Sequence, residues 1–547
     1  MIIKKIIMKI IFYYKFYRNA KIISFNKNTN NYKKKKILIA TSSGGLYSQL
    51  IFESALASGL RNNGAEVHFL LCKRGLSACI IPDNFTINEI DYINDGPKKF
   101  CKSCFNVGNN FLAKAGFKVQ YLESASKNEY QQYLEIIEKN LKFETIKEFT
   151  YKGIKVGEHT ISGTLRYYKK TNYNDEKHYK EIIKKYLISC MVTVDHFNKI
   201  LKKERYDTII LNHGIYVPHG IIADIAKKEN VHFAVWCPGV RKKTFCFSPN
   251  DTYHREQIYE QNSNWENILL TKKKEDLIIK YLKSKSVSSN DWKNEWVYSP
   301  SSSNDNIQQL FNDLKIDKSK PLIGMPTNVI WDAQIDYPEN FFKHILEWIF
   351  FTIDFFIQNQ NLQLILRIHP AEVEMTKPSK QKVYDEIMKK YNSLPNNIFI
   401  VKPEENYNTY KILNMCDNIL IYGSRLGVEM SALGKTVVVA GEGFIRNKKI
   451  AIDVNSKKEY KEILNKLPIE GHMTEQKIFR AKKYAYHFFF RRMIGLKILD
   501  ERPLEWPNFQ VNKNFSEIIN KKNDKGFEKI CDSIINKKSF IFDELEE

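Results

Sequence analysis

Short apolar runs alternate with segments of helical length along most of this chain, and this alternation constrains the fold more than any other feature. Residues 37–40 (ILIA) are followed by a small-residue loop, a helix predicted over 46–62 and a second strand over 66–71. A strand, a glycine-containing loop, a helix and a strand in this order begin a doubly wound sheet. The sequence therefore predicts an α/β fold.

The alternation continues through both halves of the chain. Further strands are expected at 206–211, 231–235, 321–325, 362–368, 398–401, 419–422 and 436–440. The chain has 547 residues, of which 43% are hydrophobic, so it exceeds one usual core and can build two. We expect two Rossmann-like domains that face each other across a cleft. The expected parts are a basic N-terminal segment over 1–36, an N-terminal domain over 37–285, a linker over 286–306, a C-terminal domain over 307–470 and a helical segment over 471–547.

The net charge of +23 narrows the classes of partner. Much of the excess is lysine in a sequence also rich in Ile, Asn and Tyr, a pattern that an AT-rich genome produces as well as a function does. The remainder suits nucleotide phosphates, a lipid-linked acceptor or an anionic membrane face. No basic helix, zinc-finger spacing or RNP-like aromatic motif is evident, so nucleic acid is not an expected partner.

The first 18 residues, MIIKKIIMKIIFYYKFYR, combine aromatic, aliphatic and basic side chains. Their longest apolar run is far short of a membrane span, and no small-residue cleavage site follows, so a signal peptide is not expected. Such a segment either lies on an anionic membrane surface or is a disordered start. Residues 346–357 are very apolar but are interrupted by Asp354, which favours a buried helix. The expected location is cytoplasmic, with peripheral attachment to the inner membrane face.

Residues 419–435, ILIYGSRLGVEMSALGK, contain the most informative motif. An apolar strand runs through Gly423 and Ser424 into a helix that carries Gly427 and Glu429. Unpaired N–H groups and the positive end of the helix dipole favour an anion there, and Glu429 is placed to accept hydrogen bonds from a ribose. The alternative is an ordinary turn, with Ser424 capping the helix and Glu429 on a solvated face.

Three more loops follow predicted strands of the second half, where ligands bind in open α/β sheets. They are 326–331 (PTNVIW), the RIHP segment and 441–446 (GEGFIR). In RIHP, Arg367 or His369 is a candidate to contact a phosphate or a base, and Pro370 fixes the turn. The alternative for each is a packed or solvated residue.

The segments RIHP, PEENYNTY and YGSRLGVEMSALGKTVVVAGEGFIR, in this order, resemble the capsular polysaccharide biosynthesis family, which are bacterial glycosyltransferases of the GT-B type. The resemblance is best over 322–464 and looser over 37–253. It implies a GT-B arrangement and a nucleotide-sugar site at Arg367, His369, Pro370, Gly423, Ser424, Gly427 and Glu429. Arg425 and Leu426 stand where many relatives have small or hydroxyl residues. No catalytic base is matched by the resemblance.

Sugar transfer also needs a group that takes the proton of the acceptor hydroxyl. His213, directly after the YDTIIL strand, and Glu53 are the candidates for this catalytic role, although a histidine that only caps a strand is an equal alternative. Arg166 and Arg241 are candidates to hold an acceptor phosphate or carboxylate, with solvated arginines as the alternative. Cations and helix N-termini stabilise the leaving phosphate in metal-independent GT-B enzymes, so no cofactor is required.

Nine cysteines are present, and four of them cluster in sequence. These are Cys72, Cys79, Cys101 and Cys104, the last two forming a CxxC. Four cysteines with one CxxC can hold a structural metal, but six residues separate the other pair, which weakens that prediction. Reduced, packed cysteines are the alternative, and a reducing compartment disfavours disulfides.

The sequence therefore predicts a glycosyltransferase that moves a sugar from a nucleotide sugar to a surface polysaccharide or lipid-linked acceptor. Two other classes remain open. One is a nucleotide-sugar epimerase of similar architecture, and the other is a non-catalytic protein of capsule assembly or export.

Overall fold

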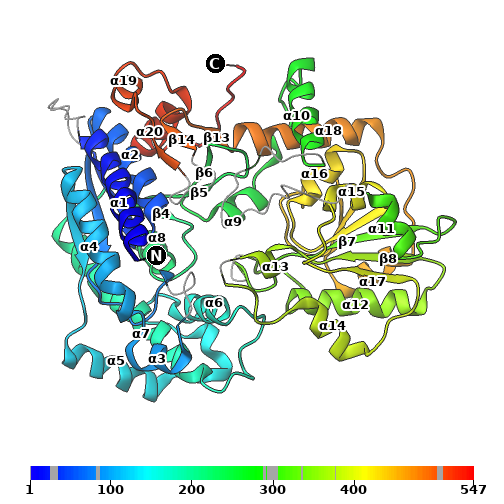
Figure 1. Cartoon of the computed structure of the whole chain (residues 1–547), viewed down its shortest axis with the longest axis horizontal. Coiled ribbons are helices and arrows are strands. Elements are labelled where there is room, and N and C mark those ends of the chain that lie inside the picture. The colour runs from blue at the N-terminus through cyan, green and yellow to red at the C-terminus, as the bar shows by residue number, and fades with distance from the viewer. Residues whose placement is uncertain are drawn as a thin grey trace. The chain divides into compact units, whose positions relative to one another are not determined.

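The chain folds into two compact α/β units in a computed structural model (Figure 1). The structure describes residues 2–24, 35–81, 87–286, 291, 306–333, 337–375, 377–501 and 509–546. Unit 1 comprises Met1–Tyr167, Asn174–Tyr253 and Arg492–Glu544, and unit 2 comprises Tyr168–Tyr173, His254–Arg491 and Leu545–Glu547. The predicted fold class is confirmed, because each unit is built on its own sheet, mainly parallel in unit 1 and fully parallel in unit 2. The cleft between the domains stays a prediction.

Unit 1 contains a seven-stranded sheet in the order β13-β6-β5-β4-β1-β2-β3. Its strands are β1 Lys36–Ser42, β2 Glu66–Cys72, β3 Lys118–Leu122, β4 Thr208–Asn212, β5 His232–Pro238, β6 Thr244–Pro249 and β13 Ile494–Gly495. The first five strands are parallel, while β6 and β13 extend the sheet in antiparallel pairing. The apolar runs over 37–40, 66–71, 206–211 and 231–235 all lie in its strands, with small differences at their ends.

The helices of unit 1 surround this sheet and continue into the C-terminal part of the chain. They are α1 Ile2–Ser24, α2 Tyr47–Asn62, α3 Glu89–Asp95, α4 Lys98–Lys114, α5 Lys127–Asn140, α6 Val156–Tyr168, α7 Tyr179–Lys203, α8 His219–Lys228, α19 Phe515–Asn520 and α20 Lys525–Asn536, with a 3-10 turn at Phe143–Glu148 and a hairpin of β14 Leu499–Glu501 and β15 Phe509–Val511. α5 shows how local sequence sets a start, because Ser126 and Glu129 form a reciprocal capping box there.

The second half of α1 is part of the core of unit 1. The Phe16 and Ala20 side chains are fully buried, and the Phe16 ring lies 4.9 Å from that of Tyr47 and 4.7 Å from that of Phe111. The predicted N-terminal segment over 1–36 is therefore packed against α2 and α4 over its residues 13–24, whereas 25–34 fall outside the described residues. Among the residues that the structure describes, no helix has the length and apolar composition to cross a membrane.

Unit 2 contains a six-stranded, fully parallel sheet in the order β12-β11-β10-β7-β8-β9. The strands are β7 Leu322–Pro326, β8 Gln363–Arg367, β9 Ile398–Val401, β10 Asn418–Ile421, β11 Thr436–Val439 and β12 Ile452–Asp453. The helices are α9 Tyr253–Ile258, α10 Lys272–Ser284, α11 Ile307–Asp313, α12 Ile345–Gln358, α13 Ala371–Glu374, α14 Val383–Tyr391, α15 Thr409–Asn414, α16 Leu426–Ala432, α17 Lys457–Leu464 and α18 Glu475–Tyr486, with a 3-10 turn at Asn262–Asn264 and a π-helical turn at His487–Arg491.

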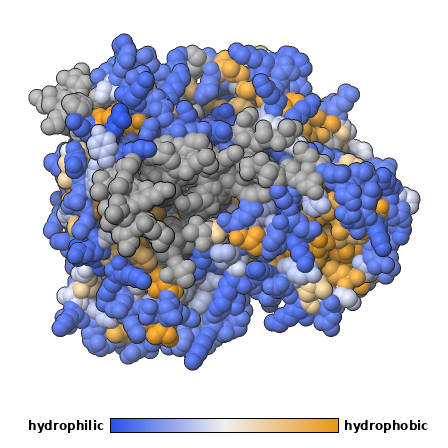
Figure 2. Space-filling view, in the orientation of Figure 1, coloured by the Kyte–Doolittle hydropathy of each residue, from blue (hydrophilic) through white to orange (hydrophobic). Residues whose placement is uncertain are grey.

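The apolar segment 346–357 forms most of α12, as predicted for a buried helix. Trp348, Ile349 and Ile353 are completely buried in the main core of unit 2. The one polar group of the Trp348 ring is satisfied, because its indole N–H donates to the Tyr460 hydroxyl at 2.9 Å. Among the residues that Figure 2 colours by hydropathy, hydrophilic ones predominate, in keeping with a chain of which 27% is charged.

The division of the chain differs from the predicted domain boundaries. The chain passes from unit 1 to unit 2 at residues 253 and 254, ahead of the predicted linker over 286–306, which lies almost wholly outside the described residues. Residues 254–284 join unit 2, where Lys482 of α18 pairs with Glu275 of α10 at 2.7 Å. The expected C-terminal segment 471–547 also divides, because β13 pairs with β6 of unit 1. Such long-range pairing is invisible to local periodicity.

Candidate functional site

Each sheet reverses its strand order at one place, and these two places define the candidate sites. In unit 1 the chain builds β1, β2 and β3 in one direction and then adds β4 on the other side of β1. In unit 2 the same reversal lies between β7 and β10. Ligands of open α/β sheets bind outside the carboxyl ends of the strands at such switch points.

At the switch point of unit 1, the last residue of β1 and the first residue after β4 both have the left-handed conformation without being glycine. Ser42 has φ +58° and His213 has φ +56°, and Gly214 follows with φ +70°. The His213 N–H donates to the Trp236 carbonyl at 3.0 Å, which fixes the turn. Left-handed non-glycine residues cost energy and cluster at ligand sites. His213 therefore lies at the sheet edge where it was expected, half-buried and 6.1 Å from the ring of Tyr253.

Glu53 lies beneath this edge and is completely buried in α2. Its carboxylate accepts hydrogen bonds from the Thr41 hydroxyl at 2.5 Å, the Trp236 indole N–H at 3.0 Å and the Gln49 amide at 3.2 Å. Burial raises the pKa of Glu53 to about 7, and these donors act against the rise. Glu53 was predicted to be catalytic, but its burial places it as a support that ties the end of β1 to β5.

His219 is a polar residue of this edge that the sequence reasoning missed. It begins α8, directly after the β4 loop, and its Nε2 lies 3.2 Å from the Thr41 carbonyl, to which it donates. Burial lowers the pKa of His219 to about 4, so the ring is neutral near pH 7. The Gln49 amide also donates to the Thr41 carbonyl, at 3.2 Å. The position of His219 after a predicted strand was the signal that could have found it.

The two arginines proposed for the acceptor side have protein partners. The Arg166 guanidinium lies 4.3 Å from the centre of the Tyr216 ring, and the residue is buried. Arg241 donates from Nη2 to the Met493 carbonyl at 3.1 Å and so attaches the β5–β6 turn to the returning C-terminal segment. Both side chains therefore differ from the alternative given above, in which they were solvated and had no protein partner. Tyr216 follows His213 by three residues, so Arg166 is the one of the two that supports the loop after β4.

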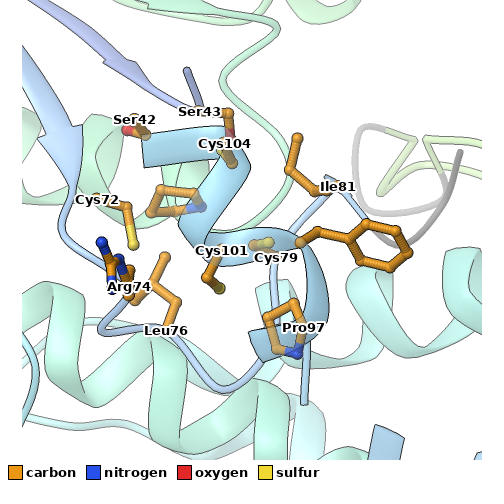
Figure 3. A pocket seen from close by; sticks show the side chains of 12 residues that line it. Ser42, Ser43, Cys72, Arg74, Leu76, Cys79, Ile81, Pro97, Cys101 and Cys104 are labelled. Carbon is orange, nitrogen blue, oxygen red and sulfur yellow. The ribbon is translucent and has the colours of Figure 1, made fainter. Parts of the chain in front are cut away.

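The four clustered cysteines line one pocket in unit 1 (Figure 3). Cys72 ends β2, Cys79 lies in the following loop, and Cys101 and Cys104 lie on α4. Ser42 and Ser43 of the switch-point loop line the same pocket. In the described part of the chain, no three of these sulfur atoms come within 4.8 Å of one another.

One group in the described residues does have that close spacing, namely Glu66, His68 and Glu204. It lies at the other end of the sheet, where β1 and β2 begin. Lys118 donates to Glu66 at 3.0 Å and Lys36 donates to Glu204 at 2.6 Å. These lysines already neutralise the carboxylates, so the group is an ion-pair network.

In unit 2 the loops after β7, β8 and β10 meet at the switch point. The Thr327 hydroxyl after β7 accepts a hydrogen bond from the His369 N–H after β8 at 3.0 Å. Asn328 approaches Gly423 after β10, where an added Cβ would lie 3.7 Å from the Asn328 Nδ2. The structure therefore brings together three of the loops that the sequence singled out.

His369 is held as a neutral hydrogen-bond donor. Its Nδ1 accepts from the Ala371 N–H at 3.1 Å, which places the ring proton on Nε2, and Pro370 caps the short α13 that begins there. Burial, then the charges of Arg425 and Arg367, lower the pKa of His369 to about 4. A neutral ring N–H near two cations is suited to a phosphate oxygen or a base carbonyl.

Glu429 is fully buried, which contradicts the solvated alternative, and it is paired within the protein, while its contact with a ribose stays a prediction. Its carboxylate accepts from the Tyr410 hydroxyl at 2.9 Å and lies 3.5 Å from Arg425 Nε and 3.8 Å from Lys285 Nζ. Lys285 also pairs with the buried Asp291. Burial opposes the charge of Arg425, but Glu429 leads the interactions that raise the Arg425 pKa overall. Arg425 lies within the motif, but Tyr410 and Lys285 come from other segments, so the motif alone gave no signal of these two.

The remaining residues of the motif set the local geometry. A Cβ on Gly427 would lie 2.6 Å from Ile421 Cδ1, so this glycine lets α16 pack closely on β10. A Cβ on Gly423 would lie 2.8 Å from the Glu442 carbonyl oxygen, which requires glycine where the two loops touch. The Ser424 hydroxyl accepts from the Leu426 N–H at 3.2 Å, but Arg425 holds the N-cap position of α16 without a side-chain cap, so the capping alternative is not met.

Arg367 supports the site from below. It is 2% exposed, and its guanidinium donates to the Lys402 carbonyl and to the Tyr407 carbonyl, the latter at 3.4 Å. Arg367 thereby fixes the loop after β9, and its charge acts on His369. The GEGFIR loop is fixed in a similar way, because Glu442 accepts from the Tyr259 hydroxyl and from the Glu339 N–H.

No protein-family model matches this chain at a significant level, and neither does any curated protein. Among solved structures, the beta Kdo 2,4 transferase KpsC of Thermosulfurimonas dismutans is 12% identical over 52% of this chain and 79% of its own, with a TM-score of 0.33. S. aureus MnaA, solved with UDP, is 12% identical over 83% and 93%, with a TM-score of 0.30. Sucrose-phosphate synthase from Thermosynechococcus elongatus is 11% identical over 84% and 95%, also with a TM-score of 0.30. These values are low, so the function has to be argued from the residues of this chain.

Proposed function

We propose that this chain is a glycosyltransferase whose unit 2 binds a nucleotide-activated sugar at the β7–β10 switch point. The observation that carries the proposal is the convergence of a neutral His369 N–H with the charges of Arg367 and Arg425 at this edge. The diphosphate of a nucleotide sugar is stabilised by hydrogen-bond donors and positive charge. This stabilisation matters most when the nucleoside diphosphate becomes the leaving group. Gly423 and Ser424 line the same edge, in the segment where the family resemblance is strongest.

We assign the acceptor to unit 1, with His213 as the group that takes the proton of the attacking hydroxyl. His213 lies at the carboxyl edge of the sheet on a left-handed turn, and Glu53 and His219 hold the adjoining end of β1. The acceptor class is a surface polysaccharide or a lipid-linked glycan, and the setting is the inner face of the cell membrane in capsule synthesis. The net charge of +23 supports this setting.

A screen of nucleotide sugars for protein-dependent release of the nucleotide tests the reaction. UDP, CMP and GDP are first compared by thermal shift, and at least one is expected to raise the melting temperature. The His369→Asn variant keeps an acceptor for the Ala371 N–H but loses the Nε2 donor, so we expect about tenfold weaker nucleotide binding. His344→Asn is the matched control, because His344 is another histidine of unit 2 and Asn serves equally well at its helix cap.

The outcomes separate the three functional classes. Nucleotide release that depends on an added glycan acceptor supports the transferase. Isomerised nucleotide sugar without an acceptor identifies an epimerase and overturns the transferase. Nucleotide binding without any turnover points to a non-catalytic assembly protein, and the absence of a thermal shift with every nucleotide contradicts the donor site itself.

A further inference from the structure

The loop after β4 receives contacts from two side chains of the same helix. His159 and Arg166 lie seven residues apart on α6, so they project from one face of the helix about two turns apart. His159 Nδ1 lies 2.8 Å from the Ile215 carbonyl oxygen. The Arg166 guanidinium lies over the Tyr216 ring. α6 therefore supports the segment that directly follows His213 at the carboxyl edge of the sheet.

The other nitrogen of the His159 ring also faces an acceptor. Its Nε2 lies 2.9 Å from the Asp224 carboxylate on α8. A neutral imidazole has one N–H donor and one acceptor nitrogen, whereas an imidazolium has two donors. A carbonyl oxygen and a carboxylate oxygen both accept, so the two contacts are hydrogen bonds together only when the ring carries two protons. The geometry therefore identifies a buried imidazolium at His159.

The sequence of α8 leaves room for this ring. Gly220 lies in the first turn of α8, and a Cβ there would overlap both His159 Nδ1 and the Ile215 carbonyl oxygen. Any side chain at this position would therefore push apart the two atoms of the hydrogen bond. Glycine is a poor helix residue, so its presence inside α8 is explained by the close approach of the ring.

The groups around the ring favour its charged form. Burial lowers the pKa of His159, but the hydrogen bond and the charge of Asp224 outweigh burial, so the pKa is raised above 6.5 overall. Glu158 of α6 acts in the same direction. α7 packs on α8 and contributes Cys190, whose pKa burial raises to about 12, so this thiol is neutral. His219, at the start of α8, has its pKa lowered to about 4 by burial and is neutral as well.

We propose that His159 is a positioning residue of the acceptor edge, whose imidazolium holds the loop on which His213 lies. The bearing on catalysis rests on the proposed role of His213, whereas the hold on the loop does not depend on any reaction. A neutral ring cannot donate from both nitrogens, so the bond to Ile215 or the bond to Asp224 is given up when the proton leaves. The stabilisation by this pair is complete below pH 6.5 and is lost as the pH rises through the higher pKa of the folded state.

The native protein gives the first test, which needs no variant. Amide hydrogen exchange of residues 213–218 is compared at pH 6 and pH 9, after correction for the intrinsic exchange rate at each pH. We expect about tenfold less protection at pH 9, because one hydrogen bond of the ring is lost. The β5–β6 turn, which Arg241 holds through the Met493 carbonyl, should show no such change. Equal protection of residues 213–218 at both pH values overturns the proposal.

Asp224→Asn should remove this pH dependence. An asparagine amide can donate to Nε2 of a neutral ring while Nδ1–H donates to Ile215, so both bonds persist at either pH. The ¹⁵N chemical shifts of the ring give a direct signature. We expect two protonated nitrogens at pH 7 in native His159 and one in the Asp224→Asn variant. A single protonated nitrogen in the native ring at pH 7 would contradict the proposal.

Variants of the ring and of α8 test the hold on the loop at pH 6. Gly220→Ala and His159→Gln each break the bond to Ile215 and should make residues 213–218 exchange about tenfold faster. His159→Asn keeps a donor near the Nδ1 position and should restore most of the protection. His68→Gln is the matched control, because His68 also pairs with a carboxylate, at the other end of the same sheet, and it should leave the loop unchanged. Native protection in both Gly220→Ala and His159→Gln would refute the hold on the loop.

The reaction provides a separate readout. Gly220→Ala should lower kcat for nucleotide release about tenfold and leave the KM for the donor unchanged, because the donor is assigned to unit 2. A loosened loop with an unchanged kcat would show that the loop does not position a catalytic group. The absence of turnover with every nucleotide sugar would contradict the proposed function alone, since loop exchange is measured without substrate.

Discussion

Glu53 in unit 1 and Glu429 in unit 2 are buried carboxyl groups on helices beside the switch points of two different sheets. Each lies on the helix that follows a strand bordering the switch point, α2 after β1 and α16 after β10. Both are completely buried. Glu53 accepts hydrogen bonds from three uncharged groups, whereas Glu429 has Arg425 and Lys285 beside it along with the Tyr410 hydroxyl.

This difference means that the two sheets, although they share one strand topology, have different charge at their switch points. Uncharged donors only partly offset the cost of burying a carboxylate, so Glu53 has a pKa of about 7 and brings no surplus charge to unit 1. In unit 2, Arg425, Lys285 and Arg367 outnumber the negative charges of Glu429 and Asp291 close to the switch point. The first edge suits a neutral hydroxyl and the second a diphosphate, which is the division of labour that sugar transfer requires.

Of the two carboxyl groups, Glu429 is the one with charged partners, and removing it should cause the largest loss of stability. Glu429→Ala leaves the buried Lys285 with Asp291 alone and removes the carboxylate beside the partly exposed Arg425, so we expect unit 2 to lose about 3–4 kcal/mol of stability. Amide hydrogen exchange of the β10–α16 peptides measures it. Weaker nucleotide binding by this variant therefore reports a ribose contact only if the fold is shown to be intact.

Glu275→Ala is the control for that experiment. Its ion pair with Lys482 is partly exposed, and its loss should cost less than about 1 kcal/mol. If Glu429→Ala cost no more than Glu275→Ala, the ion pairs of Glu429 would contribute little and the comparison with Glu53 would fail.

Much of this architecture follows from local sequence. Runs such as 398–401 and 436–440 are apolar and β-branched, short and bounded by turns, so tertiary packing had no reason to overturn their preference for strands. The loops after β7, β8 and β10 could be placed together because parallel strands end at one edge. The same reasoning placed His213 at the edge of the other sheet.

The partners of buried charges could not be predicted in this way. Glu429 meets Lys285 and Tyr410 because segments far apart in the chain fold onto α16, and no periodicity encodes that contact. The sequence made Glu53 a catalytic candidate, and no local pattern indicated that it would be buried with the Trp236 indole N–H donating to it. The return of β13 to unit 1 belongs to the same class, since two residues of an edge strand have too weak a pattern to be recognised.

The protonation of Glu53 provides the second prediction. Its pKa rises from 4.5 in the unfolded chain to about 7 in the fold, so between these values the folded protein binds more protons than the unfolded one. The stabilisation is present below pH 4.5 and is lost as the pH rises to 7, by about 3 kcal/mol in total. Glu53→Gln cannot titrate, so its stability relative to the native protein should improve by that amount over this range. Urea unfolding from pH 4.5 to 8, with exchange of the α2 peptide as the local readout, measures the change.

Glu123→Gln is the matched control, because Glu123 is exposed on the same unit. The gap between Glu123→Gln and the native protein should stay level over the same range. A level gap for Glu53→Gln as well would show that its carboxyl is not titrating in the folded state near neutral pH, and the contrast with unit 2 would disappear.

The hydroxyl of Thr41 gives a smaller effect. Thr41→Val removes one of the three donors to Glu53 at nearly constant shape, so we expect unit 1 to lose about 1–2 kcal/mol near neutral pH. The loss should grow from pH 5 to pH 8, because the donor stabilises the charged carboxylate most. Thr160→Val removes a buried hydroxyl that bonds only within α6 and its neighbours, and its cost should not vary with pH. A pH-independent loss for Thr41→Val would contradict the proposed role of this donor.

The smallest effect is expected on the pKa of His369. Burial is the first cause of its low pKa and Arg425 the second, so Arg425→Met should raise the pKa of His369 by less than about one pH unit. Arg425→Lys keeps the charge and should restore most of the native value. NMR titration of the ring measures both, and His344 is the internal control because Arg425 is not among the charges that act on it. If the pKa of His369 were the same in Arg425→Met as in the native protein, the charge of Arg425 would have no effect at the edge of the sheet. The positive surplus that separates unit 2 from unit 1 would then lie too deep to assist a leaving diphosphate, and donor binding would rest on the His369 N–H and the glycine loop alone.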